Sequence, residues 1–316
     1  MQAEYNRKDG KYMKPRKIVL LSCIAFLTIV CVIQAILAGR NPVKTLKFDG
    51  SFDEIVINNN GSEVKISLDG SDWYVGNDDF KANQSDITTI TNNIKEIKVL
   101  DTVGRLSGDD FNARWDLNDE KAISVKALKA GSEVRAMKIG KVSSTGSQTY
   151  ITVGNSKDVY LVSGNLVREF SKTEDTLKSK SIFTLNEGGI SEVTVTTPKT
   201  SWGVTKVAPP DGEITWGFTG SAEKDEADAS KISSWIRQII SLNATSWLSD
   251  STVLPKTKEV SVEITGSEGK TTVDIYSEKD GDKTKYIAVS NKTSHKAELS
   301  ETNAKKYIKD ISELKK

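Results

Sequence analysis

Residues 18–38 read IVLLSCIAFLTIVCVIQAILA, and none of these 21 residues carries a charge. An α-helix rises about 1.5 Å per residue, so a run of this length is long enough to cross the hydrocarbon core of a bilayer. The sequence therefore predicts a single transmembrane helix over residues 18–38. This helix divides the chain into a short segment on one side of the membrane and a long segment on the other.

The charges that flank the run predict its orientation. Residues 1–17 hold six basic and two acidic side chains, whereas positive charge after the run is sparse. Short cytoplasmic segments collect lysine and arginine. We therefore expect a single-pass protein of the cytoplasmic (inner) membrane, with a basic cytoplasmic tail at 1–17 and an extracytoplasmic C-terminal part. A cleaved signal peptide is the alternative, although the run exceeds the usual apolar region of about 7–15 residues.

The composition of residues 39–316 argues against two classes of protein. This part holds 38 basic and 41 acidic residues, so it lacks the positive excess of a nucleic-acid-binding protein. Both cysteines, Cys23 and Cys31, lie within the apolar run, so no disulfide is available to the rest of the chain. Burial of apolar surface must stabilise this part, whose length suits one large or two ordinary domains.

The part of the chain after the apolar run reads as two copies of one unit. Residues 52–57 (FDEIVI) open one half and residues 190–195 (ISEVTV) open the other. Both alternate apolar and polar side chains, as half-buried strands do. Each half continues with a second short strand and then an Asp-Gly turn, which favours a hairpin because glycine readily takes positive φ. The turns are Asp69-Gly70 and Asp211-Gly212, and they lead to Trp73 and Trp216.

A helix is expected after each of these tryptophans, because apolar residues recur there at helical spacing. The stripe of the first half and that of the second differ by a constant 145 positions: Ile87, Ile90 and Ile94 correspond to Ile232, Trp235 and Ile239. Ser85 is the expected N-cap of the first helix, and Asp228 or Ser230 that of the second.

Each half then continues with antiparallel strands and ends in a helix, in which Phe170 and Tyr307 occupy equivalent places. We therefore predict an α+β fold in which the transmembrane helix is followed by two tandem antiparallel-sheet units with packed helices. The expected units are residues 39–182 and 183–316, and they join near residues 177–189. The charged approach to this join suits an exposed connection; its residues are Lys172, Glu174, Asp175, Lys178 and Lys180. Two similar but independent strand meanders are the alternative to a true duplication.

The residue patterns predict no catalysis and no cofactor. His295, the only histidine, follows a polar loop without a recognisable nucleophile, so we expect it to be exposed near a strand edge. A zinc site is not expected, because such sites draw on several histidine and cysteine ligands. The pairs Asp78-Asp79 and Asp109-Asp110 are interpreted as solvated loops, since a glycosidase needs two carboxylates held together in a cleft.

The acidic run at residues 223–228 lacks the residue frame of a calcium loop. It is interpreted as negative charge placed before a helix N-terminus, where it interacts favourably with the helix dipole. The chain also lacks a glycine-rich phosphate loop. We therefore expect no catalytic, cofactor-binding or metal-binding residues.

The six tryptophans raise the question of a binding surface. Trp73 and Trp216 recur at equivalent places and Trp235 lies in an apolar stripe, so these three are expected to pack in the core. Trp115 has no clear counterpart in the other half. It is the residue for which we predict a surface role in binding.

The order of these features resembles a known family. The residues that carry the resemblance are the N-terminal anchor, residues 69–75 (DGSDWYV) with the helix that follows, and residues 176–185 (TLKSKSIFTL). They resemble the bacterial membrane-anchored proteins of unknown function that are encoded beside gliding-motility-type ABC transporters. The resemblance covers most of residues 43–316. It implies a non-enzymatic component of the cell envelope that works with an ABC permease and an auxiliary envelope protein.

We therefore expect an accessory or scaffold subunit of an ABC-transporter assembly that acts through its extracytoplasmic repeats. An envelope polymer or glycan binding module, with Trp115 at its surface, is the first alternative. A carboxylate-based hydrolase is the second alternative, and it requires two or more acids that converge in a deep pocket.

Overall fold

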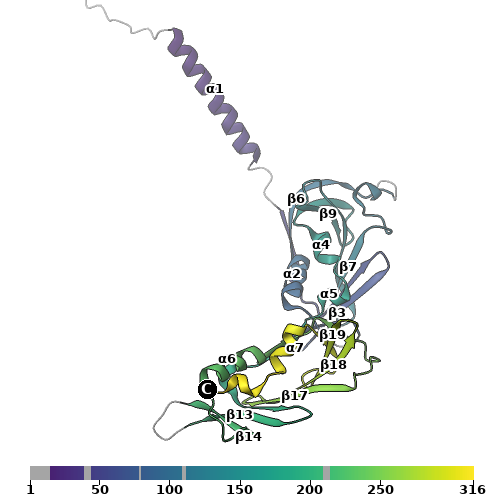
Figure 1. Cartoon of the computed structure of the whole chain (residues 1–316). Helices are drawn as coiled ribbons and strands as arrows, with labels where there is room; N and C mark the ends of the chain where they lie inside the picture. Colours follow the sequence, from purple (N-terminus) through teal and green to yellow (C-terminus); the bar gives the residue numbers. More distant parts are fainter. Residues whose placement is uncertain (1–14, 39–43, 78–79, 109–111, 209–213) are drawn as a thin grey trace, which may run out of the picture. The chain divides into compact units, whose positions relative to one another are not determined.

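The computed structural model describes residues 15–38, 44–77, 80–108, 112–208 and 214–316. It divides into two compact units, Met1–Lys178 and Ser179–Lys316, which we describe separately (Figure 1). The expected boundary after residue 182 would cut the strand β11 (Ser181–Thr184), which pairs with β15 (Ser241–Asn243). A division after Lys178 keeps this pair within the second unit.

The N-terminal helix α1 (Pro15–Ala38) is a single helix of 24 residues. It begins three residues before the expected start, because proline suits the first position of a helix, where no backbone N–H bond is needed. Its apolar stretch, Pro15–Ala35, is long and apolar enough to cross a membrane, and none of its described residues is buried. Residues 1–14 of the expected basic tail lie outside the described residues.

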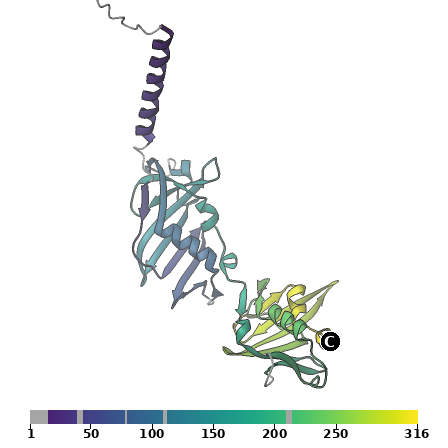
Figure 2. The same cartoon turned by 90° about the vertical axis from the view of Figure 1, so that its left-hand side faces the viewer.

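The first unit is built on one antiparallel sheet of ten strands, in the pairing order β1-β6-β10-β9-β8-β7-β2-β3-β4-β5. In chain order the strands are β1 (Lys44–Lys47), β2 (Glu54–Asn59), β3 (Ser62–Asp69), β4 (Asp72–Val75), β5 (Phe80–Lys81), β6 (Glu96–Arg105), β7 (Ile123–Lys129), β8 (Ser132–Val142), β9 (Gln148–Val153) and β10 (Asp158–Ser163). Helix α2 (Gln84–Lys95) lies across one face of this sheet (Figure 2).

The core of the first unit joins one stripe of α2 to the alternating apolar residues of the sheet. Ile87, Ile90 and Ile94 are buried together with strand residues such as Ile55 and Ile66. Each such side chain contributes roughly 1.5–3 kcal/mol on burial. The predicted helix and its apolar stripe are therefore confirmed.

Asn83 caps α2, so the prediction of Ser85 as the cap is wrong. The side-chain oxygen of Asn83 accepts hydrogen bonds from the backbone N–H groups of Ser85 and Asp86 at 3.0 and 3.2 Å. These bonds satisfy two of the donors that the start of a helix leaves unpaired. Asparagine and serine are both favoured caps, and the turn that enters the helix selects between them.

Among the described residues of the first unit, the further short helical segments are η1 (Ala113–Trp115), α4 (Leu166–Phe170) and α5 (Glu174–Leu177). Phe170 and Leu177 are fully buried in the core. These two residues hold the C-terminal part of the unit against the same sheet face that α2 covers.

The second unit contains an eight-stranded antiparallel sheet in the pairing order β14-β13-β12-β17-β18-β19-β20-β16, together with the β11–β15 pair. Its strands are β12 (Ile190–Thr196), β13 (Ser201–Val207), β14 (Thr215–Gly220), β16 (Ser246–Trp247), β17 (Thr257–Gly266), β18 (Gly269–Asp280), β19 (Lys283–Ser290) and β20 (Ala297–Leu299). Its helical segments are η2 (Glu187–Gly189), α6 (Ala229–Ile239), α7 (Glu301–Tyr307) and η3 (Ile311–Leu314).

Helices α6 and α7 pack on the core of this second sheet. Ile232, Trp235 and Ile239 are buried along one stripe of α6, as the spacing predicted. Tyr307 of α7 is fully buried, and its hydroxyl group donates a hydrogen bond to the carbonyl oxygen of Ile239 at 2.8 Å. Burial raises the pKa of this hydroxyl well above its ordinary range, so the group remains a proton donor.

The two sheets share one order of strand pairing. From β4 the neighbours in the first sheet are β3, β2, β7, β8, β9, β10 and β6, and from β14 those in the second are β13, β12, β17, β18, β19, β20 and β16. In each sheet the helix that precedes the last of these strands carries the aligned apolar stripe. The mixture of helices and antiparallel sheets agrees with the α+β prediction.

Candidate functional site

Within the described residues, no group of three histidine, cysteine, aspartate or glutamate side chains could hold a metal ion. The side chain of His295 is only 11% exposed, and its ring meets that of Trp247 edge-on, with 5.9 Å between centroids. Its Nδ1 lies 3.9 Å from Oδ1 of Asp250, which is too far for a hydrogen bond. The prediction of an exposed histidine is therefore wrong, because the polar loop folds back onto a tryptophan.

Trp115, the residue predicted to act at the surface, is buried. It is 5% exposed and packs with Leu117 and Val159 in a small cluster apart from the main core. Gly104 leaves room for the ring, since a Cβ at that position would lie 2.7 Å from it. The guanidinium carbon of Arg114 lies 5.4 Å from the ring centroid. The ring thus stabilises the first unit, so the prediction of a surface role for Trp115 is wrong.

The three tryptophans expected in the core differ in exposure. Trp235 is buried, and its Nε1–H donates a hydrogen bond to the carbonyl oxygen of Lys306 at 2.8 Å. Trp73 and Trp216 are half-buried and pack against the core of their own units. Trp216 therefore keeps part of its ring at the surface.

The acidic run at residues 223–228 lies before the start of α6, as interpreted. Oδ1 of Asp228 accepts hydrogen bonds from the backbone N–H groups of Ser230 and Lys231 at 3.0 and 3.1 Å. The bond from Lys231 is the main reason why the pKa of the Asp228 carboxyl lies below its ordinary value. All four residues of the pairs Asp78-Asp79 and Asp109-Asp110 lie outside the described residues.

A groove beside β14 is the candidate binding site of the second unit. One wall is β14 itself, and the other is the segment that leads into α6. Aromatic rings and carboxylates line it together with one lysine. We call it the β14 groove and define it by Trp216, Phe218, Glu223, Asp225, Asp228 and Lys316.

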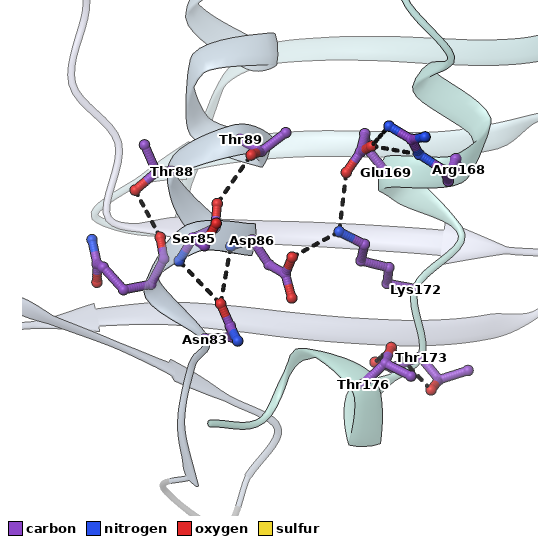
Figure 3. Close-up of polar contacts among 11 residues, drawn as sticks. Asn83, Ser85, Asp86, Thr88, Thr89, Arg168, Glu169, Lys172, Thr173 and Thr176 are labelled. Atoms are coloured by element: carbon purple, nitrogen blue, oxygen red, sulfur yellow. Dashed lines mark hydrogen bonds and ion pairs between the residues drawn. The ribbon is translucent and has the colours of Figure 1, made fainter. Parts of the chain in front are cut away.

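A lysine that was expected on an exposed connection instead joins two helices of the first unit (Figure 3). Nζ of Lys172 lies 2.8 Å from a carboxylate oxygen of Asp86, in α2, and 3.0 Å from one of Glu169, in α4. Arg168 pairs with the same Glu169 at 2.8 Å. The side chains of Lys172, Asp86 and Glu169 are all more than half buried, so this network has a structural role.

A second lysine of that connection is buried as well. Nζ of Lys178 lies 2.8 Å from Oε1 of Glu174 and 4.2 Å from the ring centroid of Phe80. The charged residues at 172–180 are therefore not all exposed. Lys172 and Lys178 contact carboxylates, and Lys178 also lies over an aromatic ring. Charge alone did not distinguish such a bridge from a solvated connection.

No sequence pattern predicted the β14 groove. Its aromatic residue, Trp216, was expected to pack in the core, and its acids were interpreted only as helix-capping charge. The available signal was a difference in length: Asn83 follows Trp73 by ten positions, whereas Asp228 follows Trp216 by twelve. The longer segment in the second half leaves the groove open.

One family model, described as "Domain of unknown function (DUF4340)", matches residues 73–260. The match covers more than half of the chain, and it begins in β4 of the first unit and ends in β17 of the second. No curated protein and no solved structure matches the chain. The family description states no activity.

Proposed function

The chain belongs to the family described as a domain of unknown function (DUF4340), and from this premise we propose that it is a non-enzymatic, membrane-anchored scaffold. In this proposal it is an accessory subunit of an ABC-transporter-type assembly of the bacterial cell envelope. Its partners are the bilayer, an ABC permease and an auxiliary envelope protein.

The helix α1 is the observation that carries the proposal. It exposes an apolar surface along its whole described length, and only residues 39–43 separate it from β1. The chain reaches at most about 3.6 Å per residue, so the number of residues alone limits this connection to roughly 20 Å. A chain tethered so closely to a membrane is positioned to meet the exposed parts of integral membrane partners.

The charge asymmetry around α1 supports an orientation with the N-terminus in the cytoplasm. Both units then lie outside the cytoplasmic membrane. A Ser251→Cys variant places a thiol at an exposed position of the second unit. Whole cells should react with a membrane-impermeant maleimide at this position, and labelling only after lysis would reverse the orientation.

The shared order of strand pairing supports the proposal that the two units are tandem copies of one α+β unit. The aligned stripes at Ile90 and Trp235 and the equivalent buried residues Phe170 and Tyr307 point the same way. We place the junction between the copies at Lys178 and Ser179. A duplicated scaffold offers two related surfaces, which can diverge to hold different partners.

Co-purification of the intact protein from detergent-solubilised membranes tests the proposed function. We expect permease and ATPase subunits to follow the chain in fixed ratio. A matched variant, in which residues 18–38 are replaced by an unrelated apolar helix, separates contacts made by α1 from those made by the two units. Recovery of the chain without any transporter subunit, while other native membrane complexes survive, would overturn the proposal.

The alternative of an envelope polymer or glycan binding module rested on Trp115. Because this ring is buried beside Gly104 and Arg114, the alternative loses the residue that motivated it.

A further inference from the structure

The terminal strand of the second sheet has an open edge. β14 pairs with β13 on one side, and among the described residues no strand pairs with its other side. An edge of this kind presents backbone N–H and C=O groups that can accept another strand. The β14 groove runs along this edge.

The first unit closes the equivalent edge with its own chain. There β5 pairs with β4, with Phe80 opposite Val75 and Lys81 opposite Tyr74. Phe80 is buried, and Nζ of Lys81 lies 2.7 Å from a carboxylate oxygen of Asp72. An extended segment with an aromatic residue followed by a lysine therefore fills this place in the first unit.

The two units can be aligned at this point by their backbone bridges. Ala82 pairs with Lys178 in the first unit, and Ala227 pairs with Lys315 in the second. Counting back from these alanines, Phe80 and Lys81 correspond to Asp225 and Glu226. The second unit thus has two acids where the first has its closing strand, and one of them, Asp225, lines the β14 groove.

We propose that the β14 groove binds an extended, basic segment of a partner protein by strand addition. This inference rests on the proposed scaffold function and names the way in which one partner is held. The backbone of the partner pairs with the open edge of β14, which provides affinity without regard to sequence. Alternate side chains of the added strand enter the groove, which provides specificity.

The lining of the groove selects the chemistry of the partner. Phe218 is buried and Trp216 is half-buried, so together they offer an apolar floor for one side chain. Three carboxylates and one lysine are the charged groups of the lining. Glu223 is exposed, and Asp225 is already paired with Lys315 at 2.7 Å. This arrangement favours lysine or arginine over acidic residues in the partner segment.

Peptide binding to the full chain in neutral detergent tests the inference. The probe is a fluorescent peptide, TKVKFKVT, which alternates lysine with apolar residues. Its first control carries N-methyl groups on alternate backbone amides, so that one edge cannot pair, and its second replaces each lysine by glutamate. We expect saturable binding of the probe and at least tenfold weaker binding of both controls.

Two matched variants test the location. Glu223→Lys with Asp225→Lys reverses the charge of the groove, whereas Glu278→Lys with Asp280→Lys reverses an identical exposed Glu-Lys-Asp sequence on β18. We expect the first variant to weaken binding at least tenfold and the second to leave it unchanged. Asp225→Phe with Glu226→Lys, which reproduces the closing residues of the first unit, should abolish binding.

Equal binding of the N-methylated peptide, or equal binding by the groove variant and its control, would overturn the inference. So would concentration-dependent dimerisation that is lost in the closing variant, since the edge would then pair with a second copy of the chain. Thermal unfolding of each variant shows that a loss of binding is not a loss of folding. Peptide binding without co-purifying transporter subunits contradicts the proposed function alone, whereas co-purification without peptide binding contradicts the inference alone.

Discussion

In each unit a side-chain contact joins two helices, but the chemistry of that contact differs between the units. In the first, Lys172 bridges carboxylates of α2 and α4. In the second, the indole N–H of Trp235 in α6 donates to the carbonyl oxygen of Lys306 in α7. An ion bridge responds to pH and salt, whereas a hydrogen bond between an indole and a carbonyl group has no titrating partner. Units with one strand order can thus respond differently to their surroundings.

The two sheets also differ at the edge beyond β4 in the first unit and β14 in the second. Phe80 closes the first sheet, while Asp225 leaves the corresponding place in the second open. The closed edge adds to stability, and the open edge is available for binding. The difference between the units therefore lies in single positions and short segments and not in the order of the strands.

Truncation of Trp235 should have the largest effect. Trp235→Ala removes a buried ring together with its hydrogen bond, and we expect a loss of about 4 kcal/mol, confined to the second unit. Hydrogen exchange of the full chain in detergent, followed by mass spectrometry, reports the protection of each unit. Trp235→Phe, which keeps the ring volume, should lose roughly 1–2 kcal/mol. An equal loss of protection in both units would contradict independent cores.

Truncation of Phe80 should open the closed edge. Phe80→Ala removes a buried ring that lies beneath Lys178, and we expect a loss of about 3 kcal/mol in the first unit. Exchange of the β4 amides should rise most. Lys81→Ala, at an exposed pair beside it, is the control and should change stability by no more than about 0.5 kcal/mol. Unchanged exchange of β4 would show that Phe80 does not hold the edge closed.

A methyl group beside Trp115 should strain the small cluster around that ring, which has no counterpart among the described residues of the second unit. The Cβ of Gly104→Ala would lie 2.7 Å from the ring, so we expect a loss of roughly 1–3 kcal/mol from overpacking. Gly108→Ala is the matched control, because nothing lies within 4 Å of its Cβ. Thermal unfolding measures both. Equal melting temperatures for the two variants would contradict the buried position of Trp115.

Removal of the ion bridge should have the smallest effect and should depend on pH. Burial opposes ionisation of Lys172 and Glu169, but their mutual hydrogen bond, with those to Asp86 and from Arg168, raises the pKa of Lys172 and lowers that of Glu169. Glu169 therefore contributes stability above its unfolded pKa of about 4.5 and loses it as pH falls through the folded value. Lys172 contributes fully below about 10.5 and loses its part as pH rises.

Lys172→Met should therefore cost roughly 1 kcal/mol near pH 7. It should also reduce the loss of protection that the first unit suffers between pH 6 and 3, which hydrogen exchange corrected for its intrinsic pH dependence measures. Lys305→Met, at an exposed helical pair in α7, is the control and should leave stability unchanged. The same acid sensitivity in the variant and the wild-type chain would show that other carboxylates cause it.

Local sequence patterns predicted many elements of the fold. The period-2 alternation at residues 52–57 and 190–195 predicted strands that appear as β2 and β12, and the spacing of Ile87, Ile90 and Ile94 predicted the buried face of α2. The turn at Gly70, with φ of +60°, joins β3 to β4 as its Asp-Gly sequence predicted. These features depend on neighbours in the chain, so they can be read from it.

Contacts between distant segments could not be read in this way. Trp115 is buried because Gly104 and the strand residue Val159 lie against it, and Lys172 is half-buried because Asp86 lies 86 positions earlier in the chain and yet beside it. The groove follows from two additional positions before Asp228, which is a change of length without a motif of its own.

The apolar run at residues 18–38, the alternation of the strands and the stripes of the helices follow from the sequence, because each reflects a local periodicity or a run of side chains that avoid water. Only the tertiary structure decided three other features. These are the closed edge at Phe80, the open edge at β14 and the different contacts that join the helices of each unit. Each of these depends on which distant backbone or carboxylate comes within a few ångströms, and that proximity exists only once the sheets have formed.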